Sequence, residues 1–139
     1  MERTLILIKP DAVERNLTGT LISRFEGLEL KLVALRMLHL DTELAQRHYA
    51  VHRDKPFFNR LVDYITSGPI VAMVFEGDNA IEVLRKAMGA TDPAKAEAGT
   101  IRADFGLDIE SNTVHGSDSV KTAEEEIKLY FAENEIVSY

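Results

Sequence analysis

His115 is the residue whose type and surroundings offer the clearest reactive chemistry. It stands among Asn112, Gly116, Ser117 and Asp118, residue types that favour turns and hydrogen-bond readily, just before a predicted helix. A neutral imidazole has a free lone pair near pH 7 and forms a labile bond to phosphorus, so this side chain can act as a nucleophile. On spacing alone, a histidine that merely hydrogen-bonds the backbone of a turn is the commoner interpretation, and both interpretations stay open here.

A histidine nucleophile needs an acid that orients its ring and favours its charged form. Glu126 falls within the first turns of the helix predicted after His115, from which its side chain can fold back towards the ring. The adjacent Glu124 and Glu125 are typical of a solvated helix face. The sequence therefore singles out Glu126 as the candidate partner.

Four isolated cations stand beside predicted strand ends, loops and helix faces: Lys9, Lys55, Arg85 and Arg102. A polyphosphate could gather such groups, although each one taken singly is more often a solvated surface charge. Phe57 lies off the buried face to which Phe58 belongs, and an exposed ring can stack on a nucleobase. Core packing or a contact between subunits is the more common role of such a phenylalanine.

His48 and His52 have the i, i+4 spacing of a helical metal pair. The metalloprotease motif HExxH nevertheless fails, because Tyr49 stands where its glutamate belongs. The chain also has no GxxxxGK[ST] loop and no GxGxxG turn. Any nucleotide site must therefore come from another architecture, and we expect no metal at this histidine pair.

The sequence pattern of the N-terminal part predicts alternating strands and helices, which would position the candidate site residues. Residues 4–8 form a short apolar run closed by Lys9-Pro10-Asp11, which predicts a buried strand and a turn. Apolar residues then recur every fourth position over 13–25, which predicts a helix that Gly19 could divide. Residues 30–40 read as a strand that is apolar on both faces and therefore internal to a sheet.

The middle of the chain has clearer boundaries. Thr42 is a plausible cap for a helix reaching about Val51, and Pro56 suits the first turn of the next helix. That helix has a buried face over 58–65 and ends at Gly68-Pro69. A strand over 70–75 and a helix over 79–88 follow.

From Gly89 to Asn112 the periodicity fades, which predicts a long loop of the kind that often carries function. Residues 114–118 suit a short strand or a turn, and Thr122 with Glu125 resembles a capping box at the start of a last helix. The order of elements indicates a mixed α/β sandwich with a largely antiparallel sheet.

The composition is that of one folded domain spanning residues 1–139. Its 139 residues are 45% hydrophobic and 28% charged, and the net charge of -7 argues against broad capture of nucleic acid. The chain contains no cysteine, which excludes disulfides and thiolate chemistry. No apolar stretch has the length of a signal-peptide core or a membrane span, so we expect a cytoplasmic protein that does not engage membranes.

The segment Asn112-Thr-Val-His-Gly-Ser-Asp118, followed by Ser119 and a glutamate-rich helix, resembles the active-site signature of nucleoside diphosphate kinases. Further matches occur in order and spacing along the whole chain: Ile8-Lys-Pro-Asp-Ala-Val13, Lys55-Pro-Phe-Phe58, Ser67-Gly-Pro-Ile-Val71, Gly89-Ala-Thr-Asp-Pro93 and Gly99-Thr-Ile-Arg102.

This resemblance implies a ferredoxin-like sandwich with a four-stranded antiparallel sheet covered by helices. A long loop between the last two strands would help to form the nucleotide site. The family assembles as hexamers or tetramers, and we expect a homohexamer, with a homotetramer as the alternative.

The resemblance also implies a role for each site residue. His115 would accept the phosphoryl group, while Glu126 and Ser117 orient and polarise it, and Lys9 completes the catalytic set. The residues implied to surround the phosphates are Lys9, Tyr49, Lys55, Arg85, Thr91 and Arg102. Asn112 with Lys9 would hold the ribose, Phe57 would stack on the base opposite Ile109 with Leu61 nearby, and Gly116 would belong to the nucleotide site.

The implied reaction is a ping-pong transfer of the terminal phosphate from ATP, GTP or another nucleoside triphosphate to a nucleoside diphosphate. Mg²⁺ would be carried by the nucleotide phosphates, without direct protein ligands and with at most indirect help from Asp118. Stacking without edge-specific hydrogen bonds would let the site accept different bases.

Three positions depart from the family pattern, and one of them is Ala98, which precedes Gly99 where proline is frequent. Glu29 stands where a glycine is expected to end the first long helix, and Gly27 could supply the turn instead. Position 55 is lysine where arginine also occurs, and lysine lacks the planar fork that binds phosphate through two hydrogen bonds.

Two other classes of function are weighed against the kinase. A ferredoxin-like module that has lost catalysis would bind nucleotide without forming a phosphoenzyme. A phosphohistidine relay protein would be a helical bundle, and the predicted strands count against it.

Overall fold

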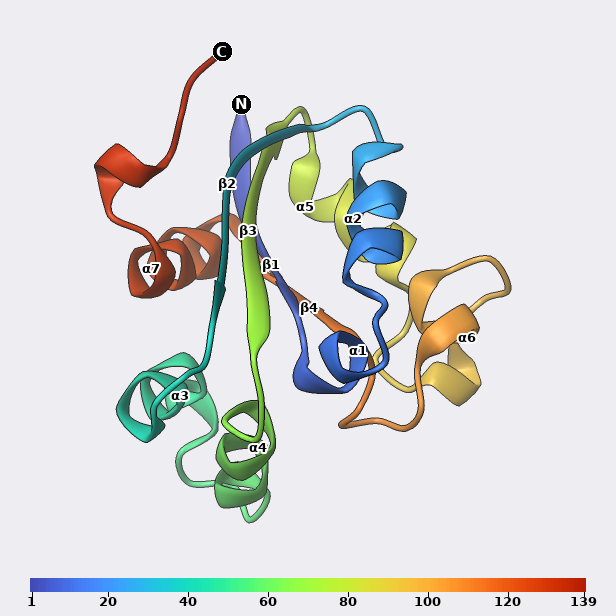
Figure 1. Cartoon of the computed structure of the whole chain (residues 1–139), viewed down its shortest axis with the longest axis vertical. Helices are drawn as coiled ribbons and strands as arrows, with labels where there is room; N and C mark the ends of the chain where they lie inside the picture. The colour runs from blue at the N-terminus through green and yellow to red at the C-terminus, as the bar shows by residue number, and fades with distance from the viewer.

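The computed structural model describes all 139 residues as one antiparallel sheet with helices on both faces (Figure 1). Its four strands lie in the order β2-β3-β1-β4. Their bounds are β1 Glu2–Ile8, β2 Lys31–Leu38, β3 Ile70–Gly77 and β4 Val114–Gly116. Every neighbouring pair in this sheet is antiparallel.

Seven α-helices and three short 3₁₀ turns connect the strands. The α-helices are α1 Pro10–Glu14, α2 Thr18–Glu26, α3 Thr42–His48, α4 Phe58–Ile65, α5 Ala80–Met88, α6 Ile101–Phe105 and α7 Val120–Tyr130. The 3₁₀ turns are η1 Ala50–His52, η2 Pro93–Lys95 and η3 Glu133–Glu135. None of the helices is both long enough and apolar enough to cross a membrane.

The two faces of the sheet carry separate halves of the core. Alternate side chains of β1 point to opposite faces of the sheet. Burial of each aliphatic side chain stabilises the fold by about 1.5–3 kcal/mol. Leu5 and Leu7 pack with residues of α3, α4 and α7. Ile6 and Ile8 pack with residues of α1, α2, α5 and α6, so β1 is covered on both sides (Figure 1). The expected ferredoxin-like fold is therefore confirmed.

The prediction that residues 30–40 form an internal strand is wrong in one respect. The strand exists as β2, but it lies at the edge of the sheet and pairs only with β3. Val33 is buried, whereas Leu35 and Met37 are 52% and 59% exposed. An internal strand that is buried on both faces and an edge strand with exposed apolar side chains can have the same sequence pattern. The sequence therefore could not distinguish the two positions in the sheet.

The first helix divides earlier than predicted. The break falls between α1 and α2 at Asn16, which has a φ of 59°, and Gly19 lies inside α2. Asparagine tolerates the left-handed conformation better than most residues, so Asn16 can end α1.

The two predicted caps are also displaced. Asp41, rather than Thr42, caps α3 by accepting from Leu44 N at 2.8 Å, and the α-helix ends at His48 before the 3₁₀ turn η1. Ser119, rather than Thr122, caps α7 by accepting from Thr122 N at 3.1 Å. In both cases the structure uses a capping side chain one to three residues nearer the N-terminus, because either position satisfies the same free N–H groups.

The long loop over 89–112 falls between the last two strands, as expected, but it is not structureless. It contains η2 and α6, the latter capped by Thr100, which accepts from Ala103 N at 3.3 Å. Both elements are too short to produce a readable hydrophobic period.

Position 29 has the backbone conformation that a glycine would favour. Glu29 has a φ of 64°, in the left-handed region, while Gly27 has a φ of -66° and does not supply the turn. A side chain costs about 1–2 kcal/mol in that conformation. The departure from the family pattern therefore places strain at Glu29.

We expect Glu29→Gly to raise the free energy of unfolding by about 1 kcal/mol, because glycine adopts a positive φ without steric cost. Chemical denaturation at fixed protein concentration measures the change. Glu26→Gly is the matched control, because this exposed residue has helical dihedrals at the end of α2 and should lose stability on the same substitution. A loss of stability in both variants would contradict the explanation.

Candidate active site

The short strand β4 sets the direction of His115. His115 pairs with Leu7 of β1 in antiparallel register, and Leu7 belongs to the face covered by α3, α4 and α7. Directly paired residues point to the same face of a sheet, so the imidazole points towards these helices. At Gly116 an added Cβ would lie 2.5 Å from Met88 Cε and 3.2 Å from Ile6 Cδ1, so glycine allows β4 to approach α5 closely.

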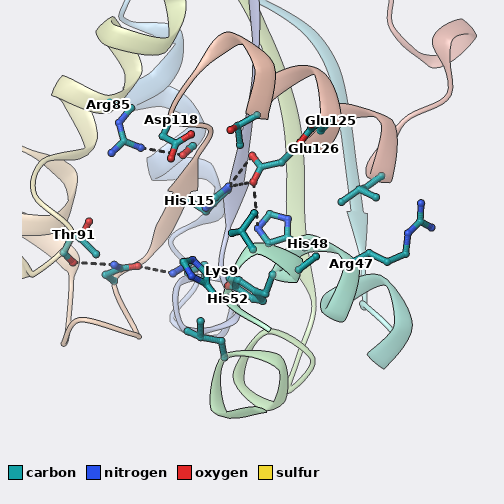
Figure 2. Close-up of a pocket in the computed structure, with 18 of the residues that line it drawn as sticks. Lys9, Arg47, His48, His52, Arg85, Thr91, His115, Asp118, Glu125 and Glu126 are labelled. Atoms are coloured by element: carbon teal, nitrogen blue, oxygen red, sulfur yellow. Dashed lines mark hydrogen bonds and ion pairs between the residues drawn. The ribbon is translucent and has the colours of Figure 1, made fainter. Parts of the chain in front are cut away.

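Glu126 reaches His115 from α7, which Ser119 caps. Glu126 lies on the buried side of this helix together with Ala123, Ile127 and Tyr130. His115 Nε2 lies 3.1 Å from Glu126 Oε1 and 3.2 Å from Oε2 (Figure 2). Ser117 Oγ donates to Oε1 at 2.6 Å. The carboxylate is therefore held by two residues of the segment around β4.

The electrostatics of this contact favour an ionised Glu126. Burial acts to raise its pKa, but the hydrogen bond and charge of His115, the nearby His48 and the Ser117 hydroxyl outweigh burial and lower the pKa to about 2. Glu126 is thus a carboxylate at neutral pH and accepts a hydrogen bond from His115 Nε2–H. The second ring nitrogen, Nδ1, makes no hydrogen bond within the chain.

His48 is a site residue that the sequence did not reveal. Its side chain is 1% exposed and its ring lies edge-on to that of His115, with centroids 4.6 Å apart and planes at 73°. Tyr130 Oη lies 3.1 Å from His48 Nδ1, and His48 Nε2 lies 3.9 Å from Glu126 Oε2. The i, i+4 spacing of His48 and His52 is that of a metal pair on one helix. In the structure, however, α3 ends at His48 and His52 belongs to the 3₁₀ turn η1.

Two imidazoles and one carboxylate converge here, and ligand atoms of His48, His115 and Glu126 lie within 4.8 Å of one another. Zinc accepts such a set of ligands in other proteins. In this chain, however, both carboxylate oxygens already accept hydrogen bonds from His115 or Ser117. The carboxylate is satisfied within the chain, so the trio needs no ion to hold Glu126 in place.

Lys9 and Asn112 join the end of β1 to the long loop. Lys9 Nζ donates to Asn112 Oδ1 at 2.7 Å and both residues are buried. Asn112 Nδ2 donates to Thr91 O at 2.9 Å and to Ile109 O at 3.1 Å. These bonds draw three segments of the loop together at one wall of the site.

The backbone beside this wall is strained. Thr113 is fully buried and has a φ of 72°, which is a steric outlier for a β-branched residue. Its carbonyl accepts from Lys9 N at 2.8 Å, and β4 begins at the next residue. The tie to Lys9 helps to hold this conformation.

Arg102 and Arg85 supply positive charge on the side of α5 and α6. Arg102 is buried and donates to Gly89 O at 2.9 Å and Val114 O at 2.8 Å, while its Nε has no partner. Burial, and then the charge of Arg85, lower the pKa of Arg102 to about 10. Arg85 is exposed and donates to Gly116 O at 3.3 Å. The Arg102 guanidinium therefore remains charged at neutral pH, and both arginines contact the β4 region.

A cavity of about 840 Å³ opens where these groups converge. The predicted site residues that line it are Lys9, Tyr49, Leu61, Arg85, Thr91, Arg102, Ile109, Asn112, His115, Gly116, Asp118 and Glu126. Figure 2 shows Arg85 and Thr91 on one side of His115, and Arg47 and Glu125 on the other.

Three predicted residues do not line this cavity. Ser117 is buried behind Glu126 and contacts the cavity through it. Lys55 is exposed in the turn before α4. Phe57 packs against His52, a lining residue, with ring centroids 5.4 Å apart. Lys55 N donates to His52 O at 2.8 Å, so Phe57 and Lys55 both adjoin a residue that lines the cavity.

Several lining residues were not singled out from the sequence, among them Arg47, Arg53, Glu125 and Leu129. Most come from α3, η1 and α7, whose polar residues read as ordinary solvated helix faces. Only the packing of α3 against α7 brings them to one opening.

Comparison with known proteins gives consistent findings. A family model described as nucleoside diphosphate kinase matches residues 2–136. A curated nucleoside diphosphate kinase of Dehalococcoides mccartyi is 63% identical over 139 residues, which cover 100% of this chain and 98% of the relative. One from Archaeoglobus fulgidus is 58% identical over 139 residues, covering 100% of this chain and 92% of the relative.

Solved structures agree with the sequence relatives. The nucleoside diphosphate kinase of Halobacterium salinarum, solved in complex with CDP, superposes with a TM-score of 0.97 at 48% identity, covering 99% of this chain and 92% of that one. That of Aquifex aeolicus gives a TM-score of 0.95 at 43% identity, covering 98% and 99%.

Because Lys9 is buried, the free energy of unfolding changes with pH in the alkaline range. Burial, and next the Arg102 charge, lower the pKa of Lys9 from 10.5 to about 8. Between these values the unfolded chain binds more protons than the folded chain, so the contribution of Lys9 to the free energy of unfolding rises with pH, by about 3 kcal/mol in total.

We expect the difference in free energy of unfolding between wild type and Lys9→Met to shift in favour of the wild type as the pH rises from 8 to 10.5. Denaturant titrations at several pH values measure it. Lys128→Met removes an exposed lysine of α7 and should keep the pH dependence of the wild type. A difference that stays constant with pH would refute the assignment.

Proposed function

This chain belongs to the nucleoside diphosphate kinase family and has the kinase activity of its relatives, and we propose that the phosphate passes through His115. In the first half of a ping-pong cycle, a nucleoside triphosphate, typically ATP, transfers its γ-phosphate to the imidazole. In the second half, the phosphohistidine transfers this group to a nucleoside diphosphate that has entered the same cavity.

The single observation that carries this proposal is the hydrogen-bonding of the His115 ring. Nε2–H faces the ionised Glu126, so the lone pair for attack is on Nδ1, which is free of hydrogen bonds. As the bond from Nδ1 to phosphorus forms, the bond from phosphorus to the β,γ-bridging oxygen breaks, and the nucleoside diphosphate leaves with that oxygen. The ring then carries positive charge, which Glu126 stabilises across Nε2–H.

The cations around the cavity offset the charge of the phosphates. Lys9, Arg85 and Arg102 lie on the wall nearest β4, where phosphoryl transfer needs fixed positive charge. Burial raises the pKa of Tyr49, so its hydroxyl stays protonated and can donate to a phosphate oxygen. Thr91 and Gly116 belong to the same lining. Lys55 lies outside the lining, and we propose that it meets the phosphates from the rim.

Mg²⁺ fits this site as an ion carried by the nucleotide. Asp118 is an exposed carboxylate on the lining near Arg85, which is too few oxygen ligands for a protein cage but enough for indirect contact through water. When bound, the ion would neutralise part of the triphosphate charge. The protein residues would still have to align the phosphate with His115.

The opposite end of the cavity suits the nucleoside. Ile109 is 58% exposed and Phe57 lies beside the opening, so a base could enter between them with Leu61 below. Asn112 and Lys9 stand where a ribose would reach the loop. Apolar walls without a fixed set of polar groups for base edges would accept several bases.

We further propose that residues 1–139 act as a single kinase domain in the cytoplasm, with nucleoside di- and triphosphates as partners and with no specific binding of nucleic acid. Self-association is supported by the edge strand β2, whose exposed Leu35 and Met37 lie beside unpaired backbone groups. We propose a homohexamer, with a homotetramer as the alternative.

The phosphohistidine is tested with ATP labelled at the γ-phosphate in the presence of Mg²⁺. We expect acid-labile, alkali-stable label on the wild type that transfers to added GDP, and no label on His115→Ala. Glu126→Gln should slow labelling about 10- to 100-fold, because His115 loses its orientation. Glu124→Gln changes an exposed residue of the same helix that does not line the cavity, and it should slow labelling far less.

An unlabelled wild type would mean that the chain only binds nucleotides. Transfer of label by His115→Ala would show that another residue is the acceptor.

The assembly is tested by light scattering coupled to size-exclusion chromatography. With a chain mass of 15.6 kDa, a hexamer gives six times and a tetramer four times that mass. A monomer would refute both expectations.

A further inference from the structure

We propose that His48, paired with Tyr130, is a positioning residue that fixes the His115 ring and the Glu126 carboxylate for phosphoryl transfer. This inference rests on the function proposed above. Neither the active-site segment around His115 nor the i, i+4 spacing of His48 and His52 suggests it, because His48 reaches the site from α3, far away in sequence.

His48 fills the space behind the two groups that change charge during the reaction. Its ring contacts His115 edge-on, with centroids 4.6 Å apart, and its Nε2 lies 3.9 Å from Glu126 Oε2 (Figure 2). Its other neighbours are Tyr49 and Tyr130, with ring centroids at 4.8 and 5.7 Å. A ring enclosed in this way prevents His115 from tilting back from the cavity.

The hydrogen bond to Tyr130 determines where His48 carries its proton. Burial, followed by the nearby Tyr49 and Glu126, raises the pKa of Tyr130, so its hydroxyl keeps a proton to donate. No other acceptor contacts that hydroxyl, and it lies 3.1 Å from His48 Nδ1. If Tyr130 donates to Nδ1, the proton of the neutral ring is on Nε2 and points to Glu126. The opposite tautomer would leave the hydroxyl proton unpaired and aim a lone pair at a carboxylate.

A neutral His48 preserves the charge balance of the site. Burial, and next the charge of His115, lower the pKa of His48 to about 3, while Glu126 acts in the opposite direction and Lys9 and His52 add to the lowering. Glu126 therefore faces only one cation when His115 becomes charged. A second cation at position 48 would compete for the carboxylate and weaken its hold on His115.

The Glu126 carboxylate is thereby fixed from three sides. Ser117 donates to Oε1 at 2.6 Å, His115 Nε2 lies 3.1 Å and 3.2 Å from the two oxygens, and His48 Nε2–H approaches Oε2. With Glu126 fixed, Nδ1 of His115 keeps one direction into the cavity. In-line transfer depends strongly on that direction, since a misplacement of about 1 Å costs about 100-fold in rate.

Two substitutions separate the proposed role from simple packing. The amide nitrogen of His48→Gln can occupy the place of Nε2 and keep an N–H directed at Glu126, whereas that of His48→Asn reaches only the place of Nδ1. Tyr130→Phe keeps the aromatic ring and removes the hydroxyl. His39→Asn is the control, because His39 is exposed and contacts only Thr66 O.

The experiment measures single-turnover phosphorylation of the native assembly by ATP and Mg²⁺, together with the dissociation constant of ATP. We expect His48→Asn to slow phosphorylation about 10- to 100-fold while ATP affinity changes less than about threefold. His48→Gln should recover most of the rate, and Tyr130→Phe should slow it about fivefold, as expected for one hydrogen bond. ¹⁵N NMR of the wild type should place the His48 proton on Nε2.

Equal rates for His48→Asn and His48→Gln would overturn the proposal, as would a loss confined to ATP affinity or a proton on Nδ1. If His48→Asn fails to fold, the Tyr130→Phe variant decides alone. Phosphorylation of that variant at the wild-type rate would then overturn the proposal. Failure of the proposed function is distinguishable, because the wild type itself would then form no phosphohistidine on His115.

Discussion

The contact between Glu126 and His115 determines what the rest of this structure must provide. It joins the inward face of α7 to the edge strand β4, and it has a defined geometry only because both elements pack against β1. An ionised carboxylate beside one ring nitrogen fixes the tautomer, and the tautomer decides which nitrogen would attack in the proposed transfer. The helix cap, the strand register and the glycine after the histidine all act on this one geometry.

The site also buries charged groups, and their burial is costly unless they are paired. Lys9 is paired with Asn112, Arg102 with two backbone carbonyls, and Glu126 with Ser117 and His115. Each pairing also fastens the long loop or α7 to the sheet. The groups that would handle phosphate charge are therefore also the groups that hold the walls of the cavity in place.

Sequence reasoning predicted the strands, most of the helices and the His115 segment, because these are encoded in local periodicity and in a contiguous motif. It missed His48, which reaches the cavity only because α3 packs against α7. It placed β2 inside the sheet, since an exposed Leu35 cannot be told from a buried one by pattern. It also chose Thr42 and Thr122 as caps, where Asp41 and Ser119 satisfy the same N–H groups. Local sequence patterns do not show which segments far apart in the chain come into contact, so these features could not be predicted.

Thr113 places local strain directly before the segment that carries His115. A buried β-branched residue with a φ of 72° sits two positions before His115, at a cost of about 1–3 kcal/mol. Selection for thermal stability alone would favour glycine or asparagine at this position. Glycine there would also loosen the backbone that enters β4, so stability-guided engineering of the chain should leave this position unchanged.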